Sequence, residues 1–97
     1  MSFKVHTRPY CPYCVKATKL LTEKGITFEE ISYPTKAEQE AFKERAGVET
    51  FPQVFFEDER IGGYDDLVAS NESGALDVLA DFDIDVVAAH LLPGSAG

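Results

Sequence analysis

The 97-residue chain has no tryptophan, a single methionine, two histidines and two cysteines. It has no apolar run close to the roughly 18 residues that a membrane-spanning helix needs, which excludes an integral membrane protein. A structural zinc site needs four ligands, so the cysteines would have to be joined by His6 and His90, which are far apart in the sequence. We therefore expect no structural zinc.

The start of the chain leaves no room for a secretory signal peptide. The opening Met-Ser-Phe-Lys-Val leads directly into an alternating pattern, without a basic segment, an apolar segment and a cleavage site. We therefore expect a cytoplasmic protein. A chain of this length suits one hydrophobic core, and an apolar content of 44% is typical of a globular domain. We expect a single domain over residues 1–92 and a disordered tail over residues 93–97.

The net charge of −8 is unevenly distributed along the chain. Residues 1–25 contain five basic and one acidic side chain, whereas residues 26–97 contain four basic and sixteen acidic ones. The acidic surface repels nucleic acid, so we expect no such partner. The basic first part favours a thiolate and attracts a small anionic thiol. We interpret the acidic surface as a whole as a feature that serves solubility or salt tolerance.

Both cysteines belong to the segment Tyr10-Cys11-Pro12-Tyr13-Cys14, which follows a strand-like pattern and precedes a helical one. Two sulfurs at this spacing can close a small disulfide ring, and a helix N-terminus stabilises the thiolate form. A purely structural disulfide is disfavoured, because closing so short a loop removes little entropy from the unfolded chain. The motif therefore predicts thiol-disulfide exchange.

Hydrophobic periodicity and turn residues predict alternating strands and helices. Thr35 and Glu38 have the spacing of a capping box, and Gly25 and Gly47 suit helix ends. The expected order is strand 3–7, helix 12–25, strand 26–31, helix 35–47, strand 53–56, a short strand from 60 that stops at 62–63, and a helix from 64. Residues 75–82 have helical spacing, and the following stretch is ambiguous.

Four separated segments together resemble the glutaredoxin family, over Phe3 to about Leu79. They are Arg8 three residues before Cys11, the cysteine motif itself, Thr50-Phe51-Pro52 before a strand, and Gly62-Gly63-Tyr64-Asp65-Asp66 at a helix start. Thioredoxins usually carry Trp-Cys-Gly-Pro-Cys, and this chain has no tryptophan. The resemblance implies the α/β thioredoxin fold, in which a four-stranded mixed sheet is flanked by helices on both faces.

The resemblance assigns roles to the cysteines and implies glutathione as co-substrate, with no metal. Cys11 matches the family's nucleophile and Cys14 its resolving thiol. Physical chemistry agrees, because we expect Cys11 to be exposed at the helix N-terminus with the lower pKa, and Cys14 to lie a turn further inside.

The resemblance also implies a glutathione site, whose residues are Arg8, Tyr13, Thr50, Phe51, Pro52, Gly63, Tyr64, Asp65 and Asp66. A cis proline at Pro52 would present the backbone of Phe51 to the cysteinyl unit. Helix-start N–H groups would bind the α-carboxylate of the γ-glutamyl end, and Asp65 its ammonium group. Arg8 would pair with the thiolate or a glutathione carboxylate.

Simpler interpretations remain for several of these residues. Helix capping explains Asp66 as well as ligand binding does, and Asp65 less well. Arg8 and Tyr13 can be ordinary exposed side chains. Phe51 stands where the family has valine, which leaves substrate preference open. We expect His6 to be a half-buried strand residue, and Phe55 and Phe56 to be core or sheet-face aromatics.

The resulting hypothesis is a monomeric, glutathione-dependent oxidoreductase. Its expected partners are glutathione and glutathionylated or disulfide-bonded proteins, with ribonucleotide reductase as one possible substrate. One alternative is a redoxin recharged by a flavoprotein reductase. Another is a non-enzymatic dimer that holds a [2Fe-2S] cluster through Cys11 of each chain and two glutathiones, against which Pro12 argues mildly.

Overall fold

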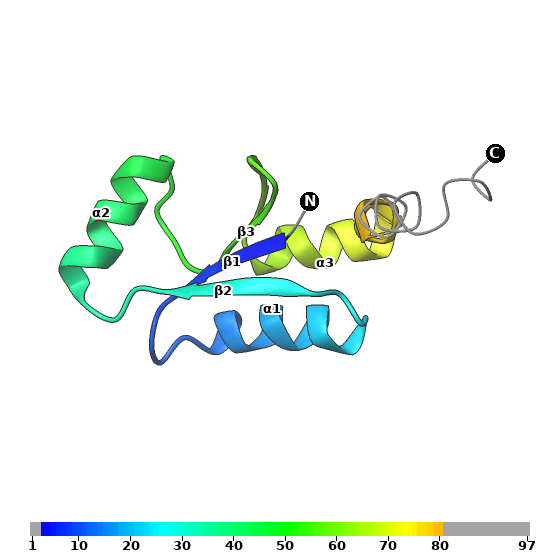
Figure 1. Ribbon diagram of the computed structural model, residues 1–97, viewed down its shortest axis with the longest axis horizontal. Helices are drawn as coiled ribbons and strands as arrows, with labels where there is room; N and C mark the ends of the chain where they lie inside the picture. The colour runs from blue at the N-terminus through cyan, green and yellow to red at the C-terminus, as the bar shows by residue number, and fades with distance from the viewer. Residues whose placement is uncertain (1–2, 81–97) are drawn as a thin grey trace, which may run out of the picture.

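The computed structural model describes residues 3–80, which form a sheet with helices on both faces (Figure 1). The elements are β1 (Phe3–Thr7), α1 (Pro12–Glu23), β2 (Phe28–Ser32), α2 (Lys36–Ala46), β3 (Gln53–Phe56), β4 (Glu59–Gly62) and α3 (Tyr64–Ser73). Residues 75–80 are also helical. The expectations for residues 81–97, including the tail over 93–97, lie outside the described residues.

The sheet has the strand order β2-β1-β3-β4. β1 pairs in parallel with β2 and antiparallel with β3, and β3 and β4 form an antiparallel hairpin. The expected four-stranded mixed sheet of the thioredoxin fold is therefore confirmed.

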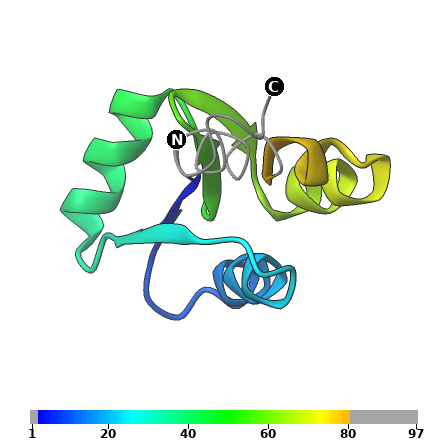
Figure 2. The same cartoon turned by 45° about the vertical axis from the view of Figure 1, so that its right-hand side comes forward.

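The alternation of side chains along β1 separates two faces of the sheet. Phe3 and Val5 are fully buried on the face that α1 and α3 cover, where they pack with Leu21 and Leu67. Burying such side chains stabilises the fold by about 1.5–3 kcal/mol each. His6, from the opposite face, stacks on α2, so α2 lies across the sheet from α1 and α3 (Figure 2).

The ends of α2 are set by the residues that the sequence indicated. The Thr35 hydroxyl accepts a hydrogen bond from the backbone N–H of Glu38 at 3.2 Å, and Gly47 adopts the left-handed conformation with φ of 69°. Phe42 is the one buried residue of this helix. The attachment of α2 to the sheet therefore depends on this ring.

The second strand begins two residues later than the sequence pattern predicted. The backbone N–H of Ile26 donates to the carbonyl of Leu21 at 2.9 Å, and Gly25 takes a left-handed φ of 72°. Ile26 therefore belongs to the turn that ends α1, although its side chain is buried in the core as a strand residue would be.

Candidate active site

The two cysteines lie at the N-terminus of α1. Cys11 is the N-cap residue, and Pro12 is the first helical residue, where its missing N–H would have no intrahelical partner. The Sγ atom of Cys11 accepts a hydrogen bond from the backbone N–H of Cys14 at 3.2 Å. A sulfur that receives a helix N–H at the positive end of the dipole is stabilised as a thiolate. This position favours Cys11 as the nucleophile.

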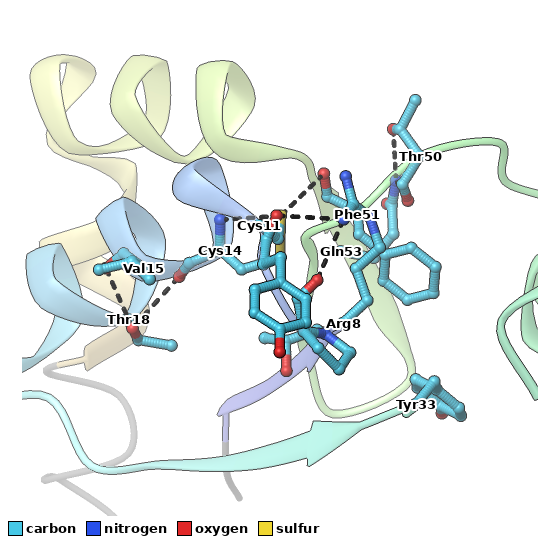
Figure 3. The surroundings of a disulfide bond; sticks show 12 residues. Arg8, Cys11, Cys14, Val15, Thr18, Tyr33, Thr50, Phe51 and Gln53 are labelled. Carbon is cyan, nitrogen blue, oxygen red and sulfur yellow. Dashed lines mark hydrogen bonds between the residues drawn. A yellow bond between two sulfur atoms is a disulfide. The ribbon is translucent and has the colours of Figure 1, made fainter. Parts of the chain in front are cut away.

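The structure describes the oxidised form, in which Cys11 and Cys14 are joined by a disulfide (Figure 3). The expectation of an exposed Cys11 is wrong for this form, since Cys11 is 5% exposed and Cys14 is 4% exposed. The backbone of Phe51 lies against Cys11, with 3.9 Å between the Sγ atom and the carbonyl oxygen. The two cysteines therefore hardly differ in exposure. They differ in position, because Cys11 caps α1 and Cys14 lies within this helix.

The segment Thr50-Phe51-Pro52 meets the cysteines although Phe51 and Cys11 are 40 residues apart in the sequence. The peptide bond between Phe51 and Pro52 is cis, in agreement with the resemblance. Pro52 is buried, whereas Phe51 is half-buried and Thr50 is exposed. This segment thus forms one wall of an open site next to the disulfide.

A groove of about 340 Å³ extends from this wall to the start of α3. Its lining includes all the residues predicted for the glutathione site except Arg8, namely Tyr13, Thr50, Phe51, Pro52, Gly63, Tyr64, Asp65 and Asp66. Ligand pockets typically measure about 300–1,000 Å³, so the groove has room for a small peptide. The structure therefore brings together residues from three distant segments of the chain.

The two aspartates at the start of α3 have different surroundings. The Asp66 carboxylate accepts a hydrogen bond from the backbone N–H of Gly63 at 3.1 Å, which makes it a capping residue. A side chain at Gly62, whose φ is 127°, would clash with this carboxylate. The exposed Asp65 carboxylate, in contrast, has no hydrogen-bond or ion-pair partner among residues 3–80. Asp65 is therefore the carboxylate available to a ligand.

Two residues of the groove were missed by the sequence analysis. Gln53 is 2% exposed, and its amide donates to the carbonyl and the hydroxyl of Thr50 at 3.0 and 3.3 Å. Arg60 donates to the Gln53 side-chain oxygen at 3.1 Å. Gln53 thus holds Thr50 in place, and Arg60 brings a positive charge to the groove. The one available signal was a polar residue at the start of the apolar strand 53–56.

Lys16 was also missed, although it lies one helical turn after Tyr13. Its Nζ atom is 5.0 Å from the ring centre of Tyr13 and 6.0 Å from that of Tyr64. The two rings, 5.9 Å apart, connect α1 to α3 at the edge of the groove. Cation–π contacts at exposed sites contribute about 0.5–1 kcal/mol. The i, i+3 spacing of Tyr13 and Lys16 could have indicated the contact between these two side chains.

Arg8 lies with the cysteines but is not among the residues that line the groove. Its Nη1 atom donates to the carbonyls of Pro9 and Tyr10 at 3.1 and 3.3 Å. Together with Glu30 and both cysteines, it lines a separate hollow of about 470 Å³. The structure thus places Arg8 in a hollow that both cysteines also line and that is separate from the groove.

Residues 3–80 contain no group of three or more histidine, cysteine, aspartate or glutamate side chains placed to hold a metal ion. Within the same residues, no helix has both the length and the apolar character needed to cross a membrane.

Comparisons with known proteins agree with the resemblance. The glutaredoxin family model matches residues 3–61. The chain is 41% identical to a glutaredoxin of Pseudomonas aeruginosa over 76 residues, which cover 77% of this chain and 90% of that protein. The solution structure of a glutaredoxin from Brucella melitensis superimposes with a TM-score of 0.71 at 42% identity, covering 82% of this chain and 88% of that one.

A third relative was solved with a ligand. The crystal structure of a buckwheat glutaredoxin-glutathione complex has a TM-score of 0.72 and 26% identity, and the match covers 81% of this chain and 76% of that one. The chain therefore belongs to the glutaredoxin family, and the family match together with the cysteine pair makes it a thiol-disulfide oxidoreductase.

Proposed function

We propose that the protein is a glutathione-dependent dithiol oxidoreductase that reduces protein-glutathione mixed disulfides and protein disulfides through Cys11 and Cys14. The observation that carries this proposal is the groove, which runs from the backbone of Phe51, beside Cys11, to the start of α3. The glutathione complex of the buckwheat relative supports the same ligand.

The groove provides complementary partners for each part of glutathione. The backbone of Phe51 pairs with the cysteinyl unit and places its sulfur near Cys11. The first N–H groups of α3 bind the α-carboxylate of the γ-glutamyl unit. The Asp65 carboxylate binds the ammonium group of the same unit in a charge-assisted hydrogen bond. Tyr13 and Tyr64 form the outer edge.

The first chemical step transfers glutathione to the protein. The Cys11 thiolate attacks the glutathione sulfur of a mixed disulfide, a new S–S bond forms, and the substrate leaves as a thiolate that takes a proton from water. A second glutathione thiolate then attacks the bound glutathione sulfur, which yields glutathione disulfide and restores the Cys11 thiolate. Each cycle therefore consumes one free glutathione, because the glutathione disulfide contains this molecule and the glutathionyl unit removed from the substrate.

The second route passes through the disulfide seen in the structure. After Cys11 attacks a protein disulfide, the Cys14 thiolate attacks the Cys11 sulfur, which releases the reduced substrate and forms the Cys11–Cys14 disulfide. Two glutathione molecules then reduce this disulfide in successive exchanges. Ribonucleotide reductase is one proposed protein substrate of this route.

Because recharging by glutathione requires a reducing compartment, we further propose that the protein acts in the cytoplasm. We also propose that it acts as a monomer. Glutaredoxins have reduction potentials of about −200 to −230 mV, which a reducing glutathione pool can recharge. This range is a family value.

The test is turnover of a glutathionylated cysteine peptide, with glutathione and glutathione reductase supplying electrons from NADPH. We expect turnover that depends on glutathione concentration. Turnover with a flavoprotein thioredoxin reductase and none with glutathione would support the alternative redoxin. Anaerobically purified protein with the visible absorbance of a [2Fe-2S] cluster and no turnover would support the cluster-binding dimer.

A further inference from the structure

The side chain of Phe51 lies among other aromatic rings. Its ring centre is 5.5 Å from that of Phe42 on α2 and 5.8 Å from that of Tyr33, which directly follows β2. Lys43 adds its Nζ atom at 5.9 Å from the same ring. Figure 3 shows the ring pointing away from the cysteines, on the side of Tyr33. The Phe51 side chain is therefore held by α2 and the end of β2.

These rings belong to a larger group that we call the aromatic cluster, made of His6, Tyr33, Phe42, Phe51 and Phe55. His6 stacks on Phe42 with 4.4 Å between ring centres and an interplanar angle of 22°. Phe55 meets His6 edge-on at 5.3 Å, and Tyr33 stacks on Phe42 at 4.7 Å. Aromatic pairs in such arrangements contribute about 0.5–1.5 kcal/mol beyond their burial. The cluster thus joins β1, β3, α2 and the Phe51 segment.

A hydrogen-bond chain connects Arg45 to two members of the cluster, Tyr33 and His6. The Nη2 atom of Arg45 donates to the Tyr33 hydroxyl at 3.4 Å. The hydroxyl and His6 Nδ1 are 3.0 Å apart, so the Tyr33 O–H donates to Nδ1 when His6 is neutral and carries its proton on Nε2. Tyr33 therefore stacks on Phe42, contacts Phe51 in a tilted arrangement and is hydrogen-bonded to His6.

The surroundings of His6 favour its neutral form. Burial lowers the pKa of His6 below its usual value of 6.5, and the positive charges of Arg45 and Lys4 lower this pKa further. The Glu29 carboxylate opposes this change with a smaller effect. At neutral pH His6 is therefore uncharged, and Nδ1 accepts the Tyr33 hydrogen bond in the tautomer that carries its proton on Nε2.

We infer that His6 and Tyr33 are positioning residues, which hold Phe51 in the orientation that binds the glutathionyl unit without touching that unit themselves. The inference rests on the proposed function. Phe51 links the two sites, because its ring packs in the cluster and its carbonyl oxygen is 3.9 Å from the Cys11 sulfur. Displacement of a binding group by about 1 Å can be costly, so loosening the ring weakens binding.

The experiment measures the affinity of the reduced protein for S-methylglutathione, which binds but cannot exchange, by calorimetry. Tyr33→Leu and His6→Leu should each raise the Kd about three- to tenfold, in line with the loss of one aromatic contact. Tyr33→Phe, which keeps the ring and loses the hydroxyl, should have a smaller effect. The rate at which iodoacetamide alkylates Cys11 should stay within about twofold of wild type, because the cysteine environment is intact.

Phe28→Leu is the matched control, because Phe28 is a partly buried sheet aromatic that packs against the main core and lies outside the cluster. This control should lower stability and leave the Kd unchanged. A second readout is pH. Acidification from about pH 7.5 to about pH 5 should weaken binding by wild type more than by His6→Phe, which keeps a ring and cannot take up a proton.

Unchanged affinity in Tyr33→Leu and His6→Leu, with wild type binding S-methylglutathione, would overturn the inference and leave the proposed function intact. An equal loss of affinity in Phe28→Leu would also overturn the inference, because general destabilisation of the fold would then explain the weaker binding. Absence of binding by wild type would instead contradict the proposed glutathione site itself.

Discussion

At the scale of single residues, the two sulfurs differ in electrostatic position and not in burial. Cys11 caps α1 and receives the N–H of Cys14, whereas Cys14 lies within the first turns of the helix. In the reduced protein we therefore expect Cys11 to hold the lower pKa and to react first with iodoacetamide at neutral pH. Peptide mapping after brief labelling measures this order. Labelling of Cys14 before Cys11 would reverse the assignment of nucleophile and resolving thiol.

The lowered pKa of His6 makes the stability of the folded protein depend on pH in a known direction. Its pKa is lowered in the folded protein, so the unfolded chain takes up the proton first as the pH falls below 6.5. The stability that neutral His6 provides is therefore complete above about pH 6.5 and is lost as the pH falls through the lowered pKa.

Urea unfolding of wild type and His6→Phe at several pH values measures this effect. Between about pH 7.5 and pH 5, the unfolding free energy of wild type should fall more steeply than that of the variant. Carboxylates titrate alike in both proteins and so cancel in the comparison. Equal slopes would show that His6 does not couple folding to pH.

At the scale of secondary structure elements, the start of α3 assigns different tasks to two neighbouring aspartates. Asp66→Asn should weaken the cap on Gly63 and lower the free energy of unfolding by up to about 1 kcal/mol, with little effect on glutathione binding. Asp65→Asn should leave stability unchanged and raise the KM for glutathionylated peptide, because a charge-assisted hydrogen bond contributes about 1.5–3 kcal/mol before solvent screening.

Each variant serves as the control for the other, since both remove one negative charge from the same helix turn. Urea unfolding and steady-state kinetics on the same preparations separate the two effects. A KM that rises equally in both variants would mean that the net charge of the helix start, and not the Asp65 side chain, governs binding.

Elements with local signals could be predicted from the sequence, whereas contacts between distant residues could not. Thr35 and Gly47 mark the ends of α2 through hydrogen bonds and backbone angles that involve near neighbours. The burial of Cys11 depends on Phe51, 40 residues away, and the stack of His6 on Phe42 joins two elements whose packing no local pattern encodes.

The candidate site follows the same rule. Motifs identified the residues that line the groove, because each motif is a short segment of fixed spacing. Gln53 and Arg60 were missed because their hydrogen bond crosses the hairpin formed by β3 and β4. Arg8 was expected at the glutathione site, and the structure places it in the separate hollow with Glu30.

At the scale of the whole molecule, the fold combines a basic and an acidic part. The segment that forms β1 and α1, residues 1–25, has five basic side chains and one acidic one, on a chain with a net charge of −8. Added salt should therefore slow the attack of anionic glutathione on the oxidised protein, because salt screens attraction by the basic part. Stopped-flow reduction at low and high salt measures this rate. A rate that rises with salt would mean that the acidic surface dominates the approach of glutathione.

The proposed function gives one protein a monothiol route for glutathione adducts and a dithiol route for protein disulfides. Reduction of a glutathione adduct needs Cys11 and a second glutathione, whereas a mixed disulfide with a protein must be resolved by a neighbouring thiol. The two routes therefore make different demands on Cys14, and a single variant can separate them.

The most direct measurement compares both rates in Cys14→Ser with those of wild type, on one preparation and with glutathione as the reductant. Cys14→Ser should retain reduction of a glutathionylated peptide, at a rate equal to or above that of wild type, because Cys14 no longer diverts the intermediate into the Cys11–Cys14 disulfide. Reduction of a protein disulfide should fall by about tenfold or more. Equal loss of both rates would contradict the monothiol route, because it would mean that Cys14 is needed in every cycle.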